Sequence, residues 1–92
     1  KIAENDNRKA CIFGIGMIGS SLVDYNVQKI LERCNKMVDE DSKLICRAGA
    51  YVSFSSFPKA KNSASAICKN SDKEAESRCL NEIPSLIYQK KT

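Results

Sequence analysis

Apolar side chains recur at spacings of three and four between residues 23 and 38, which is the period of an amphipathic helix. Charged and amide side chains fill most positions between them, so one face would be buried and the other hydrated. The acidic turn formers at residues 39–42 predict a sharp bend, in which Asp41 or Ser42 caps a second helix. The pattern predicts a helical hairpin, and the apolar positions of its first arm are Val23, Val27, Ile30, Leu31, Cys34, Met37 and Val38.

The chain after the bend predicts shorter helical segments. Residues 44–57 carry a helical apolar stripe, although the second half of this segment also fits an extended strand. Pro58 lacks a backbone donor and disfavours helical geometry in the residue before it, so a boundary is expected there. A short apolar stretch follows up to residue 70. Ser71 and Glu74 then have the spacing of a capping box, which predicts the start of another helix.

The two ends of the chain carry little pattern. Residues 1–8 are polar and lack an apolar period, so we expect an irregular lead-in. At the other end Pro84 ends or kinks the last helix, and residues 86–87 offer one more apolar turn. No repeat or low-complexity stretch divides the chain. The pattern therefore predicts one all-α domain over residues 1–92, built as a small bundle of four to five short helices.

Residues 10–23 form a stretch of fourteen residues without a charge. This length is too short to span a bilayer, and it predicts either a core helix or a segment that lies at an interface. If one face of the stretch is exposed, its apolar side chains beside a positively charged body suit insertion at a membrane surface. The residues of this membrane or packing segment that we single out are Phe13, Gly16, Met17, Gly19 and Ser20.

The glycines of this stretch resemble a known motif. Gly14, Gly16 and Gly19 follow a short apolar run in the order G-x-G-x-x-G, which is similar to the dinucleotide-binding fingerprint of Rossmann domains. Asp39 falls about twenty residues later, where that family places its ribose-binding acid. A Rossmann domain needs a second strand before this acid, however, and the helical pattern of residues 23–38 leaves no room for one. A dinucleotide-binding fragment is the least favoured interpretation, and no cofactor is expected.

A packing role explains the same glycines more simply. Gly16 and Ser20 are four residues apart, so they lie on one face of a helix and allow a neighbouring backbone to approach closely. Gly14 and Gly19 would loosen or end the helix. We therefore expect close contact between this segment and a second helix.

Five cysteines and no histidine occur in 92 residues. Cysteine at this density in a short chain is typical of a disulfide framework in a secreted protein with a small core. The chain begins at Lys1 and contains no leader pattern, which suits a mature exported chain. No two cysteines form a C-x-x-C unit, so no metal site is expected. Without histidine neither a Ser-His nor a Cys-His nucleophile pair can form, which predicts a non-enzymatic protein.

The positions of the cysteines favour particular pairs. Cys34 and Cys46 lie six residues on either side of the acidic bend, so a bridge between them suits the predicted hairpin. Cys68 and Cys79 straddle their turn unequally, and we expect Cys11 to pair with one of them. A nested set, with Cys34 joined to Cys79 and Cys46 to Cys68, is the alternative. The odd cysteine is buried, free or bridged to a second copy, and the last option would give a homodimer.

Charge changes this picture little. The net charge is +4, and basic residues are spread along the chain with acidic ones between them, so no nucleic acid partner is expected. The acidic cluster at residues 39–41 lacks the spacing of a calcium loop, and we interpret it as solvated helix caps. Tyr51, Phe54 and Phe57 are interpreted as core residues.

The cysteine gaps alternate between long and short, and in this they are similar to the six-cysteine pattern of saposin-like lipid-binding helical proteins. That resemblance implies a helical hairpin and a lipid function. The chain departs from the pattern because it lacks the paired cysteines at the start and has a longer final gap. The sequence predicts a secreted, extracellular binding protein that contacts another protein or carries a small apolar ligand between its helices. The alternative is a lipid- or membrane-active helical protein.

Overall fold

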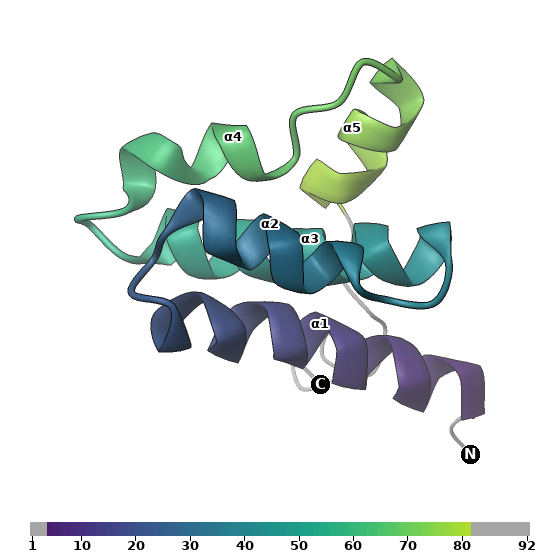
Figure 1. Ribbon diagram of the computed structural model, residues 1–92. Helices are drawn as coiled ribbons and strands as arrows, with labels where there is room; N and C mark the ends of the chain where they lie inside the picture. The colour runs from purple at the N-terminus through teal and green to yellow at the C-terminus, as the bar shows by residue number, and fades with distance from the viewer. Residues whose placement is uncertain (1–3, 82–92) are drawn as a thin grey trace, which may run out of the picture.

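The computed structural model describes residues 4–81, and over this range the protein is all-α. Two disulfides link its helices, so the predicted all-α, disulfide-linked bundle is confirmed. The chain runs through the helices in the order shown in Figure 1. The elements are α1 (Glu4–Leu22), α2 (Val27–Asn35), α3 (Glu40–Ser56), the single-turn 3-10 helix η1 (Lys61–Ser63), α4 (Ala64–Ile67) and α5 (Lys73–Asn81).

Helix α3 is the centre of the bundle and contacts α1, α2, α4 and α5. Figure 1 shows α1 along one edge of the molecule, α2 and α3 in the middle, and α4 and α5 on the opposite side. The buried apolar side chains form two clusters, and α3 contributes to both. The first is Ile12, Phe13, Cys34, Ile45, Cys46, Ala48, Cys68 and Cys79. The second is Ile30, Ala50, Phe54, Ala60, Ala64 and Ile67.

Two glycines allow α1 and α3 to approach each other closely. A Cβ atom built on Gly16 would lie 2.0 Å from the carbonyl oxygen of Cys46, and one built on Gly49 would lie 2.0 Å from that of Phe13. The hydroxyl of Ser20 is buried and donates to the carbonyl oxygen of Gly16 at 2.8 Å, so it is satisfied within its own helix. Backbone therefore packs directly on backbone at this crossing, which only glycine permits.

The structure shortens the predicted helix over residues 23–38 at both ends. Helix α1 ends at Leu22, and Asp24 and Tyr25 have positive φ angles of 56° and 55°. The amide of Tyr25 donates to the carbonyl oxygen of Ser20 at 2.8 Å, which closes the helix end. Asn26 then caps α2 by accepting a hydrogen bond from the amide of Lys29. The prediction of one continuous helix over residues 23–38 is wrong, because α2 covers only Val27–Asn35.

Aromatic packing explains the turn between α1 and α2. The ring of Tyr25 stacks on Phe57 with a centroid distance of 4.4 Å and meets the edge of Phe54 at 5.2 Å. Both partners lie at the end of α3, more than twenty-five residues away in the sequence. Left-handed backbone at a tyrosine is unfavourable on its own. The two ring contacts hold it in place.

Other boundaries also differ from the sequence prediction. All of α3 is helical up to Ser56, so its second half is not extended. Helix α5 begins at Lys73, and Asp72 rather than Ser71 accepts from the amide of Glu74 at 3.1 Å. Helix α1 includes residues 4–8, so the irregular lead-in expected over residues 1–8 is wrong for these five, and residues 1–3 lie outside the described part of the chain. The predicted effects of Pro84 and of residues 86–87 lie outside the described residues.

The cap of α3 is Asp39, two residues before the predicted Asp41 and three before Ser42. Its carboxylate accepts from the amide of Ser42 at 2.7 Å and from the guanidinium of Arg8 at 3.3 Å. The hydrogen bonds from Ser42, and then the charge and hydrogen bond of Arg8, lower the pKa of Asp39 from its ordinary value of 3.8. The cap thus also links the start of α3 to α1.

This cap predicts a pH dependence of stability. Because the pKa of Asp39 is lower in the folded chain, its ionised form stabilises the fold above the unfolded pKa of 3.8, and this contribution is lost as the pH falls through the folded value. Asp39→Asn keeps an acceptor at the cap but does not titrate. We expect the urea midpoint of the wild type to fall more than that of Asp39→Asn between about pH 5 and about pH 2. Equal falls in the two proteins would contradict the assignment.

Candidate binding surface on α1

The disulfides follow the sequence prediction in one case and depart from it in the other. Cys34 and Cys46 are joined, as predicted from their distance to the bend. Cys68 is joined to Cys79, so the predicted bridge to Cys11 is wrong and so is the nested set. Unequal chain distances from the turn did not prevent this pairing, because α4 ends at Ile67 and Cys68 lies in the turn itself. Cys11 is a free, exposed thiol.

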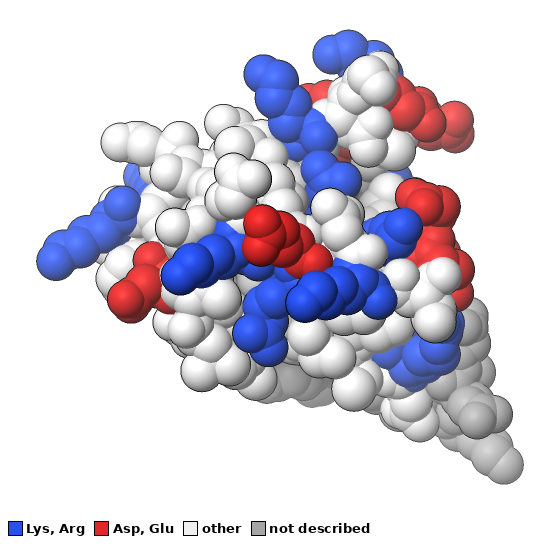
Figure 2. Space-filling model, in the orientation of Figure 1, with Lys and Arg blue, Asp and Glu red and all other residues white. Residues whose placement is uncertain are grey.

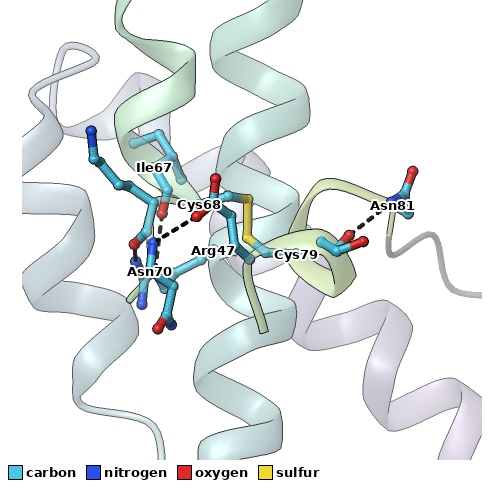
Figure 3. The surroundings of a disulfide bond; sticks show 9 residues. Arg47, Ile67, Cys68, Asn70, Cys79 and Asn81 are labelled. Atoms are coloured by element: carbon cyan, nitrogen blue, oxygen red, sulfur yellow. Dashed lines mark hydrogen bonds between the residues drawn. A yellow bond between two sulfur atoms is a disulfide. The ribbon is translucent and has the colours of Figure 1, made fainter. Parts of the chain in front are cut away.

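Arg47 holds the turn that carries Cys68 (Figure 3). Its Nε atom donates to the carbonyl oxygen of Ile67 at 3.0 Å, and its terminal nitrogen donates to that of Lys69 at 2.9 Å. Ile67 is the last residue of α4 and Lys69 lies beyond its end, where carbonyl groups lack a partner within the helix. The sequence analysis did not predict this role of Arg47. Its position directly after Cys46, within an otherwise apolar part of α3, was the available sign that its side chain binds backbone groups.

The segment singled out in α1 faces the interior. Phe13, Gly16, Gly19 and Ser20 are buried, and Met17 is half-buried against the first core cluster. A Cβ on Gly19 would lie 3.2 Å from the side chain of Ile30, so α2 also approaches α1 at a glycine. These residues serve the packing of α1 against α3 and α2.

The opposite face of α1 carries a second row of apolar side chains, which we call the apolar strip. It consists of Cys11, Ile15, Ile18 and Leu22, at spacings of four, three and four. Ile15 is 41% exposed, Ile18 64% and Leu22 69%. Sequence reasoning did not identify the strip, because residues 10–23 contain no charge and do not reveal which face is outside. The spacing alone was the available signal.

The strip forms one side of an open hollow of about 350 Å³. Within residues 4–81, a Cβ on Gly14 would meet nothing within 4 Å, so the packing of these residues does not require a glycine at this point. Helices that are apolar on every side are normally buried. Among the described residues, the strip is an apolar helix face that remains exposed. The hollow is lined by Ala10, Cys11, Gly14, Ile15, Ile18, Gly19, Leu22 and Arg33.

A row of basic residues borders the strip. Lys29, Arg33 and Lys36 are exposed and lie four and three residues apart, so they follow one side of α2; we call them the basic row. The Nε atom of Arg33 lies 3.5 Å from the position of a Cβ on Gly19. The basic row is thus on the side of α2 that borders α1. Figure 2 shows Lys and Arg side chains over α2, with the largely uncharged surface of α1 below them.

A second hollow of about 450 Å³ lies between α3 and α5 and is polar. Four of its charged side chains form ion pairs: Asp41 pairs with Arg78, and Glu40 with Lys43 at 3.1 Å. The acidic cluster at residues 39–41 is thus used in a cap and three ion pairs, because Asp39 also pairs with Arg8. Such exposed pairs contribute little to stability. The hollow presents no feature that selects a ligand.

Within residues 4–81, no three side chains of the His, Cys, Asp or Glu type lie close enough to hold a metal ion. No helix in that range combines the length and the apolar character needed to cross a bilayer. Comparison of the chain with protein-family models, curated proteins and solved structures finds no match.

Proposed function

We propose that this chain is a secreted, non-enzymatic binding protein that acts by contact through the apolar strip of α1. The observation that carries the proposal is the exposure of Ile15, Ile18 and Leu22 in one row on a helix face without any charge. Complete burial of such a side chain is worth about 1.5–3 kcal/mol, so a partner that covers the strip would gain several kcal/mol. Exposed apolar rows of this kind mark interaction sites.

Contact is favoured over carriage of a small ligand between the helices. The interior around α3 is filled, and Phe54, Ile30, Ile45 and Ile67 are completely buried in it. The backbones of α1 and α3 touch at Gly16 and Gly49, which leaves no space between these helices. Ligand-carrying proteins enclose most of the ligand surface, whereas the apolar hollow here is open on the outer side of α1.

The cysteine chemistry supports export. Both disulfides join buried sulfurs, and such bridges persist in oxidising compartments. The absence of histidine from the sequence supports a non-enzymatic role. A second copy is the other candidate partner for the strip, because the exposed thiol of Cys11 lies at its end and would form a bridge between two chains.

Two measurements test contact against carriage. We expect the wild type to be retained on an octyl resin, and Ile18→Ser/Leu22→Ser to lose most of this retention because two exposed apolar side chains are removed. Val38→Ser is the matched control, since Val38 is 89% exposed in the turn after α2.

Titration with the fluorescent probe N-phenyl-1-naphthylamine is expected to show no saturation at one probe per chain. Saturable binding of the probe, unchanged in the double variant, would establish carriage instead.

A further inference from the structure

The basic row gives the apolar strip a charged border on one side. Glu32 is the acidic residue of α2, and it lies about 100° around the helix from Arg33. Because Arg33 approaches Gly19 of α1, Glu32 is turned further from the strip than Arg33 is. The basic row is thus interposed between the apolar strip and the acidic side chain. Asp24, two residues beyond Leu22, is the acidic residue that follows the end of the strip.

The shape of this surface suits a flat partner. Helix α1 forms one edge of the described part of the molecule (Figure 1), and Ile15, Ile18 and Leu22 are exposed along it. A groove that receives an amphipathic helix needs apolar walls on both sides of the bound helix. Here the α2 side of the hollow is formed by the charged side chain of Arg33, so it is not apolar. An exposed apolar face bordered by basic side chains is typical of helices that lie in the headgroup region of a membrane.

We infer that the apolar strip and the basic row together dock this protein on an anionic lipid surface. The inference rests on the proposed function, because it names the partner of the contact surface. The side chains of Ile15, Ile18 and Leu22 enter the boundary between headgroups and acyl chains. Lys29, Arg33 and Lys36 meet the negative headgroups, and the net charge of +4 adds a weaker attraction. Neither element alone is expected to give stable binding.

Co-sedimentation with vesicles tests the inference with the full chain. We expect binding to phosphatidylcholine vesicles that contain phosphatidylserine at about one part in three, and much weaker binding to pure phosphatidylcholine. Each basic residue near an anionic surface is worth about fivefold in affinity. Lys29→Gln/Arg33→Gln/Lys36→Gln is therefore expected to weaken binding by about 100-fold.

The matched control removes the same charge from another part of the surface. Lys59, Lys61 and Lys69 are exposed and belong to the segment 59–69, whose helices η1 and α4 lie on the far side of α3 from α1 (Figure 1). Lys59→Gln/Lys61→Gln/Lys69→Gln is expected to change binding by no more than about threefold, because these residues do not meet the headgroups. Ile18→Ser/Leu22→Ser is expected to weaken binding about 50-fold, and Val38→Ser to leave it unchanged. Circular dichroism and a non-reducing mass measurement confirm that each variant is folded with both disulfides.

Several results would overturn the inference. These are equal binding to both kinds of vesicle, equal losses in the two triple variants, or no binding of the wild type to either vesicle. If vesicles do not bind but light scattering shows a dimer that Ile18→Ser/Leu22→Ser dissociates, a second copy covers the strip. The proposed contact function would then stand while the lipid inference fails. Saturable binding of the naphthylamine probe without vesicle binding would overturn both.

Discussion

Gly49→Ala is expected to destabilise the fold by about 3 kcal/mol, since overpacking a rigid contact costs this much. The added Cβ would lie 2.0 Å from the carbonyl oxygen of Phe13, and this oxygen belongs to helical backbone that cannot rotate away. The helices α1 and α3 would have to move apart. The first core cluster, which includes Phe13 and Cys46, would lose packing along the whole crossing.

Gly16→Ala is expected to have a similar effect, because its Cβ would meet the carbonyl oxygen of Cys46 at 2.0 Å. The double variant should lose less than the sum of the two, since helices already separated by one Cβ accommodate the second. Gly14→Ala is the control in the same helix, and no other described residue lies within 4 Å of its Cβ position. It is expected to stabilise α1 by about 0.5–1 kcal/mol.

Urea unfolding followed by circular dichroism measures all four proteins. If Gly14→Ala destabilises the chain as much as Gly49→Ala does, the glycines are needed for a reason other than the crossing. A neutral Gly49→Ala would contradict the close approach directly. The vesicle experiment adds a second use for Gly14→Ala, since this variant adds a methyl group beside the apolar strip without changing the core.

The helical character of the chain was accessible from the sequence because its signals are local. The period of three and four in residues 27–35 is a property of neighbouring side chains, and Cys34 and Cys46 lie at matching distances from one bend. The close approach at Gly16 was also foreseeable, since a small residue on a buried helix face has few other uses. Its partner Gly49 was not identified, because a single glycine in a helix does not indicate which helix approaches it.

The turn at residues 23–26 could not be predicted from local pattern. Val23 and Val27 continue the apolar period across it, and the two residues with positive φ are an aspartate and a tyrosine rather than glycines. What holds the turn is the packing of Tyr25 against Phe54 and Phe57. That contact depends on how α1, α2 and α3 assemble, and tertiary packing overrides local propensity.

The apolar strip was hidden for a related reason. Helix α1 is apolar on both sides between residues 10 and 23, so the sequence identifies an uncharged helix but not its exposed face. Only the position of α3 against Gly16 shows that Ile15, Ile18 and Leu22 are left outside. The same holds for the basic row, because only the packing of α2 against α1 shows that its charges border the strip.

Removal of the bridge between α2 and α3 is the second prediction with a large expected effect. Cys34→Ala/Cys46→Ala opens a loop with a sequence separation of 12. Chain entropy predicts a loss of about 3 kcal/mol. Both sulfurs are completely buried in the first core cluster, so the lost packing adds to this value. The bridge also fixes α2, and with it the basic row, beside α1.

The bridge between Cys68 and Cys79 is the natural comparison, because its sequence separation of 11 gives nearly the same chain entropy. Cys79 is the buried residue of α5, so Cys68→Ala/Cys79→Ala is expected to release α5 alone. Hydrogen exchange should then rise in α5 while α1, α2 and α3 stay protected, whereas loss of the Cys34 bridge should lower protection throughout these three helices. Cys11→Ser is the control and should leave both exchange and unfolding unchanged, since its thiol is free and exposed. Equal global losses from the two bridge variants would show that α5 is part of the cooperative core.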